Sequence, residues 1–394
     1  MLPTFTLLLY WRRDFTVKSY NNLWEKFISE ENIHTCIEKA AVGKRKRNSV
    51  KRALSDIDTY VGIIRGYAEN FENATHQEIT IRDGNSGKER IIIVPRFKEH
   101  VIHHMVVQTM LPLLTTGMYK HTYSSIPGRG LHKCMKKMKA WIEHDPRNVK
   151  YCLKLDVKKF FNSIDHEVLI DKMRKHIKDE RFLSVVIEII NASDRGIPIG
   201  FYTSHWFANW LLQPLDHLIK EELGVKYYVR YMDDMVLFGS NKRKLHEARK
   251  RIEEFLNNEL HLRLKENWQL FRFDYIDKHG EHRGRALDFV GFKFYRDKIV
   301  LRKSIMLRLT RKIRKINKKG KLTIFDAHQL MAWLGWIDWT DTYNVYCKYV
   351  AKTINFKRCR KRISDYDHEL ATMKKALKKL SEEQESVGVR YLQI

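Results

Sequence analysis

KYYVRYMDDMVLFGS, residues 226–240, places two adjacent aspartates, Asp233 and Asp234, between two apolar runs that favour β-strands. Consecutive side chains of a strand point to opposite faces of the sheet, so both carboxylates can approach one site only if the chain turns tightly there. The segment therefore predicts a β-hairpin with an acidic tip at the edge of a buried sheet. An ordinary hairpin tip without a catalytic role is the commoner meaning of two adjacent aspartates, so other features must decide.

A third aspartate supports a catalytic interpretation. Asp156 ends another apolar run, NVKYCLKLD at residues 148–156, which reads as a second buried strand. Mg²⁺ prefers oxygen ligands, and two such ions can hold the attacking and leaving oxygens of a phosphoryl transfer. We predict that Asp156 and Asp233 bridge two Mg²⁺ ions, for which Mn²⁺ can substitute, and that Asp234 supports them.

The net charge of the chain indicates a polyanionic partner. Its 394 residues include 74 Lys and Arg against 47 Asp and Glu, a formal charge of +27. Nucleic acid is the polyanion that best fits such an excess, which a metabolic enzyme does not need. A basic surface that serves solubility alone is the alternative, and charge does not name a reaction.

Composition favours a globular cytoplasmic protein. Hydrophobic residues make up 43% and aromatic residues 12%, so the chain can bury cores in two or three structural units and is not disordered as a whole. Five cysteines lie scattered without zinc-site spacing, which indicates reduced thiols. The apolar opening, residues 1–11, is far shorter than the ~20 residues that a membrane span needs. We expect a packed N-terminal segment and no membrane association.

Hydrophobic periodicity predicts the order of elements along the chain. Strand-rich runs are expected at 76–83 and 89–96, joined as a hairpin, at 148–156, at 226–240, and as a second hairpin at 286–302. Helices are expected over 20–71 with a basic break at 43–49, over 97–111, 182–193 and 196–223, from 242 to near Lys265, and from Ser304 to the end.

These segments form an ordered series of motifs that resembles the reverse transcriptases over roughly residues 76–310. The resemblance rests on LKLDVKKFFNSIDH (153–166) and YVRYMDDMVLF (228–238) as palm aspartate motifs, GIPIGFYTSHWFAN (196–209) as the helix motif beneath the nascent base pair, the hairpin running into IIIVP (91–95) as the fingers motif, IPGRGLHK (126–133) as the basic motif, and DFVGFKF (288–294) as the primer-grip hairpin. It implies an α+β right-hand polymerase. The expected divisions are an N-terminal helical extension (1–75), fingers (76–150), palm (151–295, with fingers helices at 166–195), and a basic helical thumb and tail (296–394).

The resemblance implies roles for residues at the nucleotide site. Lys88 and Arg90 would bind the triphosphate of the incoming dNTP through charge-assisted hydrogen bonds, and two charges on a solvated hairpin are the alternative. Phe161 would be the steric gate, a ring that leaves no room for a 2′-hydroxyl. Its neighbour Phe160, which points the opposite way in an extended chain, would be a core residue.

The resemblance also extends the metal site and adds contacts to nucleic acid. Val157 would join the three aspartates at the metal ions. Arg129 would contact triphosphate or template, and His205 and Gly291 would contact template and primer. Lys265 is a candidate general acid that protonates the leaving pyrophosphate, although a lone lysine after an amphipathic helix is usually a surface residue.

One departure from the wider family indicates a subgroup. Ile199-Gly200 stands where most reverse transcriptases have Gln-Gly, and an isoleucine cannot offer the hydrogen bond that helps to reject a wrong base pair. This pattern resembles the error-prone reverse transcriptases of diversity-generating retroelements, although His205 stands where these usually have Gln. A simple packing role is the alternative for Ile199. The subgroup implies mutagenised cDNA from a template-repeat RNA, a structured RNA partner, a small basic accessory variability protein, and a bacterial or phage gene.

Two rival functions stay open. An antiphage-defence reverse transcriptase that copies a dedicated noncoding RNA is the first. An RNA-binding scaffold with a dead polymerase fold is the second, and the intact Asp156, Asp233 and Asp234 argue against it.

The C-terminal region is expected to hold the template–product duplex. Its basic runs at 308–321 and 355–364 would neutralise phosphates with little sequence preference. Trp333, Trp336 and Trp339 recur every three residues and fit one helical face, which favours a core role over base stacking or a protein partner.

Overall fold

A computed structural model describes residues 19–74, 76–82 and 89–391, with side chains described to residue 373. Residues 1–11, which we expect to pack as an N-terminal segment, and Lys88 lie outside these ranges. The chain divides between Phe273 and Asp274 into two compact units. The four-part division into extension, fingers, palm and thumb stays a prediction.

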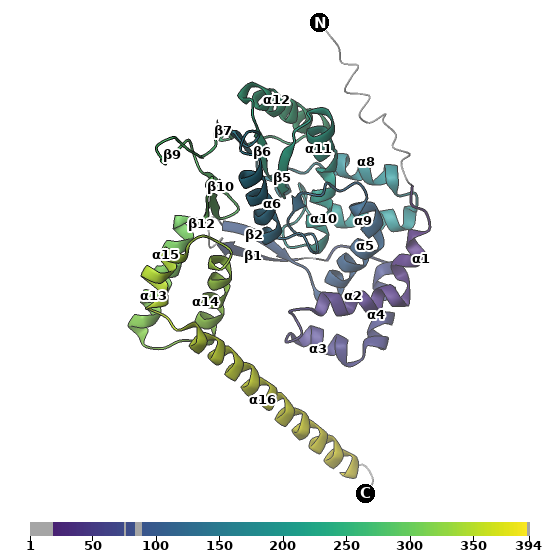
Figure 1. Ribbon diagram of the computed structural model, residues 1–394. Coiled ribbons are helices and arrows are strands. Elements are labelled where there is room, and N and C mark those ends of the chain that lie inside the picture. Colours follow the sequence, from purple (N-terminus) through teal and green to yellow (C-terminus); the bar gives the residue numbers. More distant parts are fainter. Residues whose placement is uncertain (1–18, 75, 83–88, 392–394) are drawn as a thin grey trace. The chain divides into compact units, whose positions relative to one another are not determined.

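Helices dominate the first part of the first unit, as predicted (Figure 1). Two side-chain caps set the boundaries between neighbouring helices, because Ser29 accepts a hydrogen bond from the backbone N–H of Asn32 and Asp56 accepts one from that of Thr59. The helices are α1 (Leu23–Ile28), α2 (Glu30–Ala41), α3 (Asn48–Ser55), α4 (Ile57–Glu69) and α5 (Phe97–Thr115). α2 packs against both α4 and α5, and the basic break separates α2 from α3.

A mixed sheet forms the centre of the first unit. Its strand order is β3-β5-β6-β4-β7, and all neighbours are antiparallel except the β3–β5 pair. The strands are β3 (Thr122–Tyr123), β4 (Tyr151–Asp156), β5 (Tyr227–Tyr231), β6 (Asp234–Gly239) and β7 (Gln269–Arg272). Met235 to Phe238 of β6 are buried, which confirms that the acidic segment borders a buried sheet.

Further helices surround this sheet. They are α6 (Leu131–His144), α7 (Phe160–Ser163), α8 (His166–His176), α9 (Glu180–Ile190), α10 (Tyr202–Leu211), α11 (Gln213–His217), the π-helix η1 (Leu218–Glu222) and α12 (Lys242–Glu259). α12 packs on β4, β6 and β7. It ends at Glu259 and not near Lys265, because a left-handed residue, His261, breaks the helical backbone. The helix expected at 196–223 begins at Tyr202 and is divided, since Pro214 lies in the first turn of a new helix, α11.

The predicted first hairpin is confirmed and is fastened to a loop of the first unit. β1 (Gln77–Arg82) and β2 (Glu89–Val94) pair in antiparallel register. The backbone N–H of Ile93 donates a 2.8 Å hydrogen bond to the carbonyl of Ile199. Gly200 has a φ of 120°, and a Cβ there would overlap the carbonyl oxygen of Ile93. Only glycine therefore fits where the loop meets the hairpin.

The second unit joins short strands to helices. The segment expected as a hairpin at 286–302 forms three antiparallel strands, because the chain turns a second time between Tyr295 and Lys298. The strands are β8 (Tyr275–Ile276), β9 (His282–Arg283), β10 (Leu287–Phe289), β11 (Phe292–Phe294) and β12 (Ile299–Leu301). The helices are α13 (Lys303–Lys319), α14 (Ile324–Ile337), α15 (Tyr343–Tyr346), the π-helix η2 (Cys347–Ala351) and α16 (Phe356–Tyr391).

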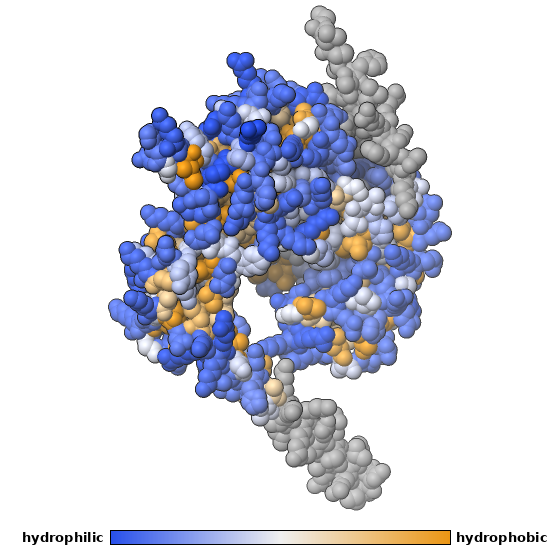
Figure 2. Space-filling model, viewed as in Figure 1, coloured by the Kyte–Doolittle hydropathy of each residue, from blue (hydrophilic) through white to orange (hydrophobic). Residues whose placement is uncertain are grey.

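Of the three tryptophans predicted to share a core face, Trp333 and Trp336 are half-buried and Trp339 is exposed. The buried residues of α14 are Asp326, Ala327, Leu330, Leu334 and Ile337, whereas Trp339 lies beyond its end and is 41% exposed. Trp336 is half-buried and stacks on Phe292. Hydrophobic surface gathers over α13 and α14 on the face shown in Figure 2. Leu307 of α13 and Phe325 of α14 are exposed. Within the described residues, no helix is both long and apolar enough to cross a membrane.

Candidate active site

The sheet brings the three predicted aspartates together. Antiparallel pairing of β4 and β6 places Asp156 directly opposite Asp234, and Asp233 occupies the turn just before β6. Met232 in that turn has a φ of 58°, a left-handed conformation that lets the chain reverse within two residues. Burial, then the charges of Asp156 and Asp234, raise the pKa of Asp233 to about 7. Three carboxylates crowded in this way favour a bound cation.

Asp156 has one neutralised and one unsatisfied oxygen. Its Oδ2 forms an ion pair with Nζ of Lys265, and its backbone carbonyl accepts a 2.8 Å hydrogen bond from the Lys265 N–H. Its Oδ1 is buried and accepts no hydrogen bond from the described residues. The oxygens present suit a divalent cation, which prefers carboxylate and carbonyl ligands. The structure thus places Lys265 at the carboxylates, and its role as a general acid stays a prediction.

Val157 continues the strand beyond Asp156. It is fully buried and forms an isolated β-bridge with Leu264. The bridge holds the end of β4 beside the segment that carries Lys265. A role of Val157 at the metal ions stays a prediction.

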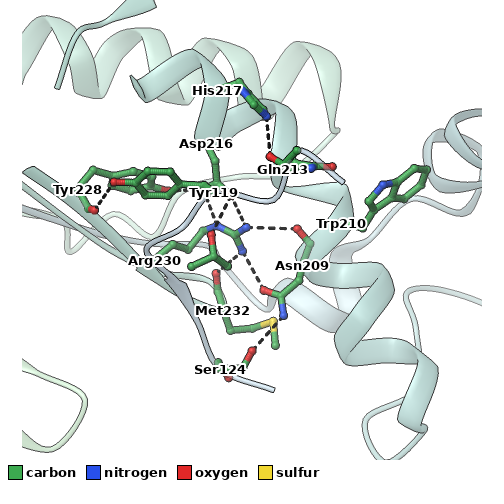
Figure 3. A network of polar contacts seen from close by, with 12 residues as sticks. Tyr119, Ser124, Asn209, Trp210, Gln213, Asp216, His217, Tyr228, Arg230 and Met232 are labelled. Carbon is green, nitrogen blue, oxygen red and sulfur yellow. Dashed lines mark hydrogen bonds and ion pairs between the residues drawn. The ribbon is translucent and has the colours of Figure 1, made fainter. Parts of the chain in front are cut away.

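A buried polar network supports the turn from behind (Figure 3). Arg230 of β5 binds Asp216 of α11 through Nε at 2.7 Å and Nη2 at 2.5 Å, and both side chains are fully buried. The remaining nitrogen, Nη1, donates to the carbonyl of Met232 at 3.2 Å and to Oδ1 of Asn209 at 3.1 Å. The hydroxyl of Tyr228 donates to Asp216 at 2.8 Å.

The family motifs do not reveal this network, but the sequence carries a signal for it. Arg230 interrupts an apolar strand, and Asp216 interrupts an apolar helical stretch. Charged residues are almost never fully buried unless they are paired. An arginine and an aspartate in two apolar elements therefore indicate a buried ion pair, although not its contact with Met232.

The predicted gate residue lies against the predicted template contact. The ring centroids of Phe161 and His205 are 5.2 Å apart, with the rings edge to face. Phe160 is buried, as predicted, but both phenylalanines lie in the short helix α7 and not in an extended chain. Burial lowers the pKa of His205, so its imidazole is neutral at neutral pH. The carbonyl of Phe161 accepts a 2.9 Å hydrogen bond from Ile197, which ties α7 to the loop that carries Ile199.

The other predicted contacts are spread over the chain. Arg90 is exposed on β2. Arg129 is half-buried and donates through Nη1 to the carbonyl of Tyr119 at 2.9 Å, so part of its hydrogen-bonding capacity serves the fold. Gly291 belongs to the second unit and has a φ of 93°. A Cβ there would lie 2.9 Å from Trp336, so backbone conformation and packing together account for the glycine.

A second group of ligand-type side chains lies in the second unit. Single ligand atoms of Asp274, His282 and Asp297 lie within 4.8 Å of one another. Nδ1 of His282 contacts Asp274 at 2.9 Å, and the backbone N–H of Arg296 donates to the same carboxylate at 2.8 Å. Nζ of Lys298 lies 3.4 Å from His282. These hydrogen bonds, with the ammonium nearby, give the group a structural role: it joins β9 to the turn before β12.

Several known proteins are similar to parts of this chain. Retron Ec73 reverse transcriptase of Escherichia coli is 29% identical over 208 residues, which cover 48% of this chain and 62% of that protein. Protein YkfC of Escherichia coli (strain K12) is 20% identical over 148 residues, covering 35% and 39%. The chain thus spans less than two thirds of the length of these curated relatives.

Solved structures give a more distant likeness. Telomerase from Candida albicans in complex with a TWJ fragment of telomeric RNA has a TM-score of 0.42 at 13% identity, covering 65% of this chain and 54% of that chain. Apo telomerase from Candida tropicalis has a TM-score of 0.41 at 14% identity, covering 63% and 52%.

A family match covers the sheet, the aspartates and the turn that supports them. Residues 81–291, more than half of the 394-residue chain, match the family described as Reverse transcriptase (RNA-dependent DNA polymerase). This range begins in the first hairpin, contains Asp156 and both residues of the Asp233-Asp234 pair, and ends at Gly291. The mixed helix and sheet fold agrees with the predicted class, and the chain belongs to the reverse transcriptase family.

Proposed function

We propose that this chain is an RNA-directed DNA polymerase that adds dNTPs to a primer 3′-OH. The observation that carries the proposal is the placement of Asp156 opposite Asp234, with Asp233 in the adjoining turn. Members of this family use divalent metals, and the three carboxylates with Val157 would hold two ions, Mg²⁺ or Mn²⁺. Bound there, such ions supply Lewis-acid stabilisation of the charge that develops on phosphate oxygens.

The chain's own residues position the reaction. Lys265 forms an ion pair with Asp156, which would orient that carboxylate, and would protonate the leaving pyrophosphate as a general acid. The Phe161 ring would exclude a 2′-hydroxyl beside His205. Arg90, with Lys88, would bind the triphosphate, while Arg129, His205 and Gly291 would contact template and primer.

Primer extension on a defined RNA tests this activity. The wild-type chain, with dNTPs and Mg²⁺, should extend the primer, and Asp233→Asn should not. RNA binding should be nearly unchanged in the variant, because the basic surface that binds phosphates is intact. Extension by Asp233→Asn at more than about a tenth of the wild-type rate would contradict the role of this carboxylate.

The error-prone enzyme of a diversity-generating retroelement is the finer function that we propose. Ile199, half-buried at the loop beneath β2, offers no amide to a nascent base pair, which supports low discrimination. The substrates would then be a structured template-repeat RNA and its cDNA duplex, with a small basic accessory variability protein as partner. Sequencing of the cDNA should show errors concentrated opposite template adenines.

A second candidate is an antiphage-defence enzyme that copies a dedicated noncoding RNA. The similarity to Retron Ec73 reverse transcriptase over 208 residues favours it. This alternative predicts accurate cDNA at adenines and one dedicated RNA bound by the purified protein. Neighbouring genes separate the two candidates, because only a retroelement has a variable target gene with a matching repeat.

A further inference from the structure

α16 is a single helix of 36 residues, and among its described side chains, up to residue 373, the buried ones lie at its beginning. Phe356 and Cys359 are buried, and Phe356 stacks on Tyr346 with ring centroids 6.3 Å apart. Further along, burial decreases until Met373 is 63% exposed. In proteins, most of the stability of a helix comes from tertiary packing of its apolar face. The exposed part of α16 therefore needs a partner surface.

The sequence of α16 carries a heptad repeat. Apolar residues follow one another in alternating steps of three and four, which gives a period of 3.5 and not the 3.6 of a helix lying on a globular core. The positions of this stripe are Phe356, Cys359, Ile363, Tyr366, Leu370, Met373, Leu377, Leu380, Gln384, Val387 and Tyr391. A repeat sustained over four or more heptads is typical of a coiled coil.

We infer that α16, from Ile363 onward, pairs with α16 of a second copy of this chain as a parallel two-stranded coiled coil. The charged residues beside the stripe favour α16 of a second copy as the partner helix. Ile363 and Leu370 occupy a positions of the heptad. In a parallel coiled coil in register, the g residue just before an a position faces the e residue five positions later in the partner helix. Arg362 then faces Asp367 of the second copy, and Glu369 faces Lys374 of the second copy. Both pairs have opposite charges, so the stripe is complementary to itself.

The stripe also contains a polar residue that can fix the register of the two helices. Gln384 is the one stripe position from Ile363 to Tyr391 that carries a side-chain amide, and no stripe position in this range is charged. A single polar side chain at such a position costs stability but fixes the register and the two-stranded state. From Ile363 to Tyr391 the paired helix would be about 40 Å long at 1.5 Å per residue. That length gives four heptads, enough for a stable pair, and the pairing does not depend on the proposed polymerase activity.

The test measures the mass of the full chain in solution after nuclease treatment, by light scattering or sedimentation. We expect a dimer whose dissociation constant rises about tenfold in Arg362→Glu and in Asp367→Arg, since each change places two like-charged pairs across the interface. The double variant Arg362→Glu/Asp367→Arg restores opposite charges and should return to within about threefold of wild type. Arg358→Glu makes the same charge change at an exposed position away from the stripe and is the matched control.

Three outcomes would overturn the inference. A chain that stays monomeric at all concentrations would show that α16 stands alone or covers another partner. A dimer lost on nuclease treatment would show that RNA bridges two copies through the basic residues of the helix. Equal weakening by Arg358→Glu and Arg362→Glu, without recovery in the double variant, would show a charge effect unrelated to parallel pairing.

Discussion

The guanidinium of Arg230 donates a 3.2 Å hydrogen bond to the carbonyl of Met232, two residues further along the chain. Met232 is buried and has a left-handed backbone, and its N–H is held by the carbonyl of Tyr123 at 3.3 Å. Both polar groups of a strained residue are thus satisfied inside the sheet. Asp216 anchors the guanidinium from the other side, so the shape of the turn before Asp233 depends on α11.

Replacing the Arg230–Asp216 ion pair with uncharged residues should leave the protein folded but lower its rate of nucleotide addition. Arg230→Met/Asp216→Asn removes both charges together, which avoids the large cost of one unpaired buried charge, and the asparagine keeps an acceptor for Tyr228. We expect a folded variant whose extension rate falls at least about tenfold and which needs more Mg²⁺ for half-maximal activity. Steady-state kinetics over a Mg²⁺ series measures both.

The control for this variant is Lys226→Met, which removes an exposed ion pair with Asp145 beside the same strand. It should change neither the rate nor the Mg²⁺ requirement. A stable double variant with the wild-type Mg²⁺ requirement would show that the turn keeps its shape without Arg230.

Asp233→Asn should stabilise the metal-free protein although it abolishes nucleotide addition. The raised pKa of Asp233 reflects burial and repulsion from Asp156 and Asp234, and removing one charge relieves both. In EDTA we expect the free energy of unfolding of the variant to be about 1–2 kcal/mol higher than that of the wild type. Its melting temperature should then be several degrees higher. Mg²⁺ should raise the wild-type midpoint more than that of the variant. Asp171→Asn, at an exposed site, should do neither, and a lower midpoint for Asp233→Asn would contradict the repulsion.

Phe161→Ala should admit ribonucleotides. Truncating the ring opens the space beside His205 that a 2′-hydroxyl would occupy. The ratio of dNTP to rNTP incorporation should fall at least about tenfold in single-nucleotide extension assays. Phe160→Leu changes the buried neighbour and should leave the ratio unaltered. An unaltered ratio in an active Phe161→Ala enzyme would place the gate elsewhere.

Ile199→Gln should raise fidelity, chiefly opposite template adenine. A restored hydrogen bond of ~1 kcal/mol in favour of the correct pair would change discrimination several-fold. Deep sequencing of cDNA made on one RNA by both enzymes measures the effect. Ile197→Val, a buried change in the same loop, is the control for packing alone. If the wild type were already accurate at adenines, the retroelement assignment would fall and the polymerase would stand.

RNA binding should weaken steeply with salt. The basic C-terminal helices lead us to expect about 5–10 phosphate contacts, so the logarithm of affinity should fall with a slope near that number. Neutralising Arg358, Arg360 and Lys361 together should lower the slope by about three. Fluorescence anisotropy between about 50 and 200 mM salt tests this, and a flat dependence would remove the electrostatic meaning of the +27 charge.

Sequence alone predicted the meeting of the aspartates because strand periodicity and a tight turn are local properties, visible at Asp156 and at Asp233-Asp234. The Arg230–Asp216 pair needed tertiary structure, since nothing local tells which buried charge meets which. The third strand at 299–301 was hidden because the Tyr295–Lys298 turn contains no glycine or proline. The prediction for Trp339 was wrong because the helix that sets the spacing ends at Ile337, so its ring leaves the expected face.

Contacts at Ile93 and Gly200 couple the β1–β2 hairpin to the loop at 196–200. A hydrogen bond and a glycine packed against backbone join them, so β2 cannot swing without carrying the loop at 196–200 along. If the hairpin moves to bind a triphosphate, the loop that carries Ile199 would move with it. Binding of the triphosphate and recognition of the base pair would then be coupled, before nucleotide addition takes place.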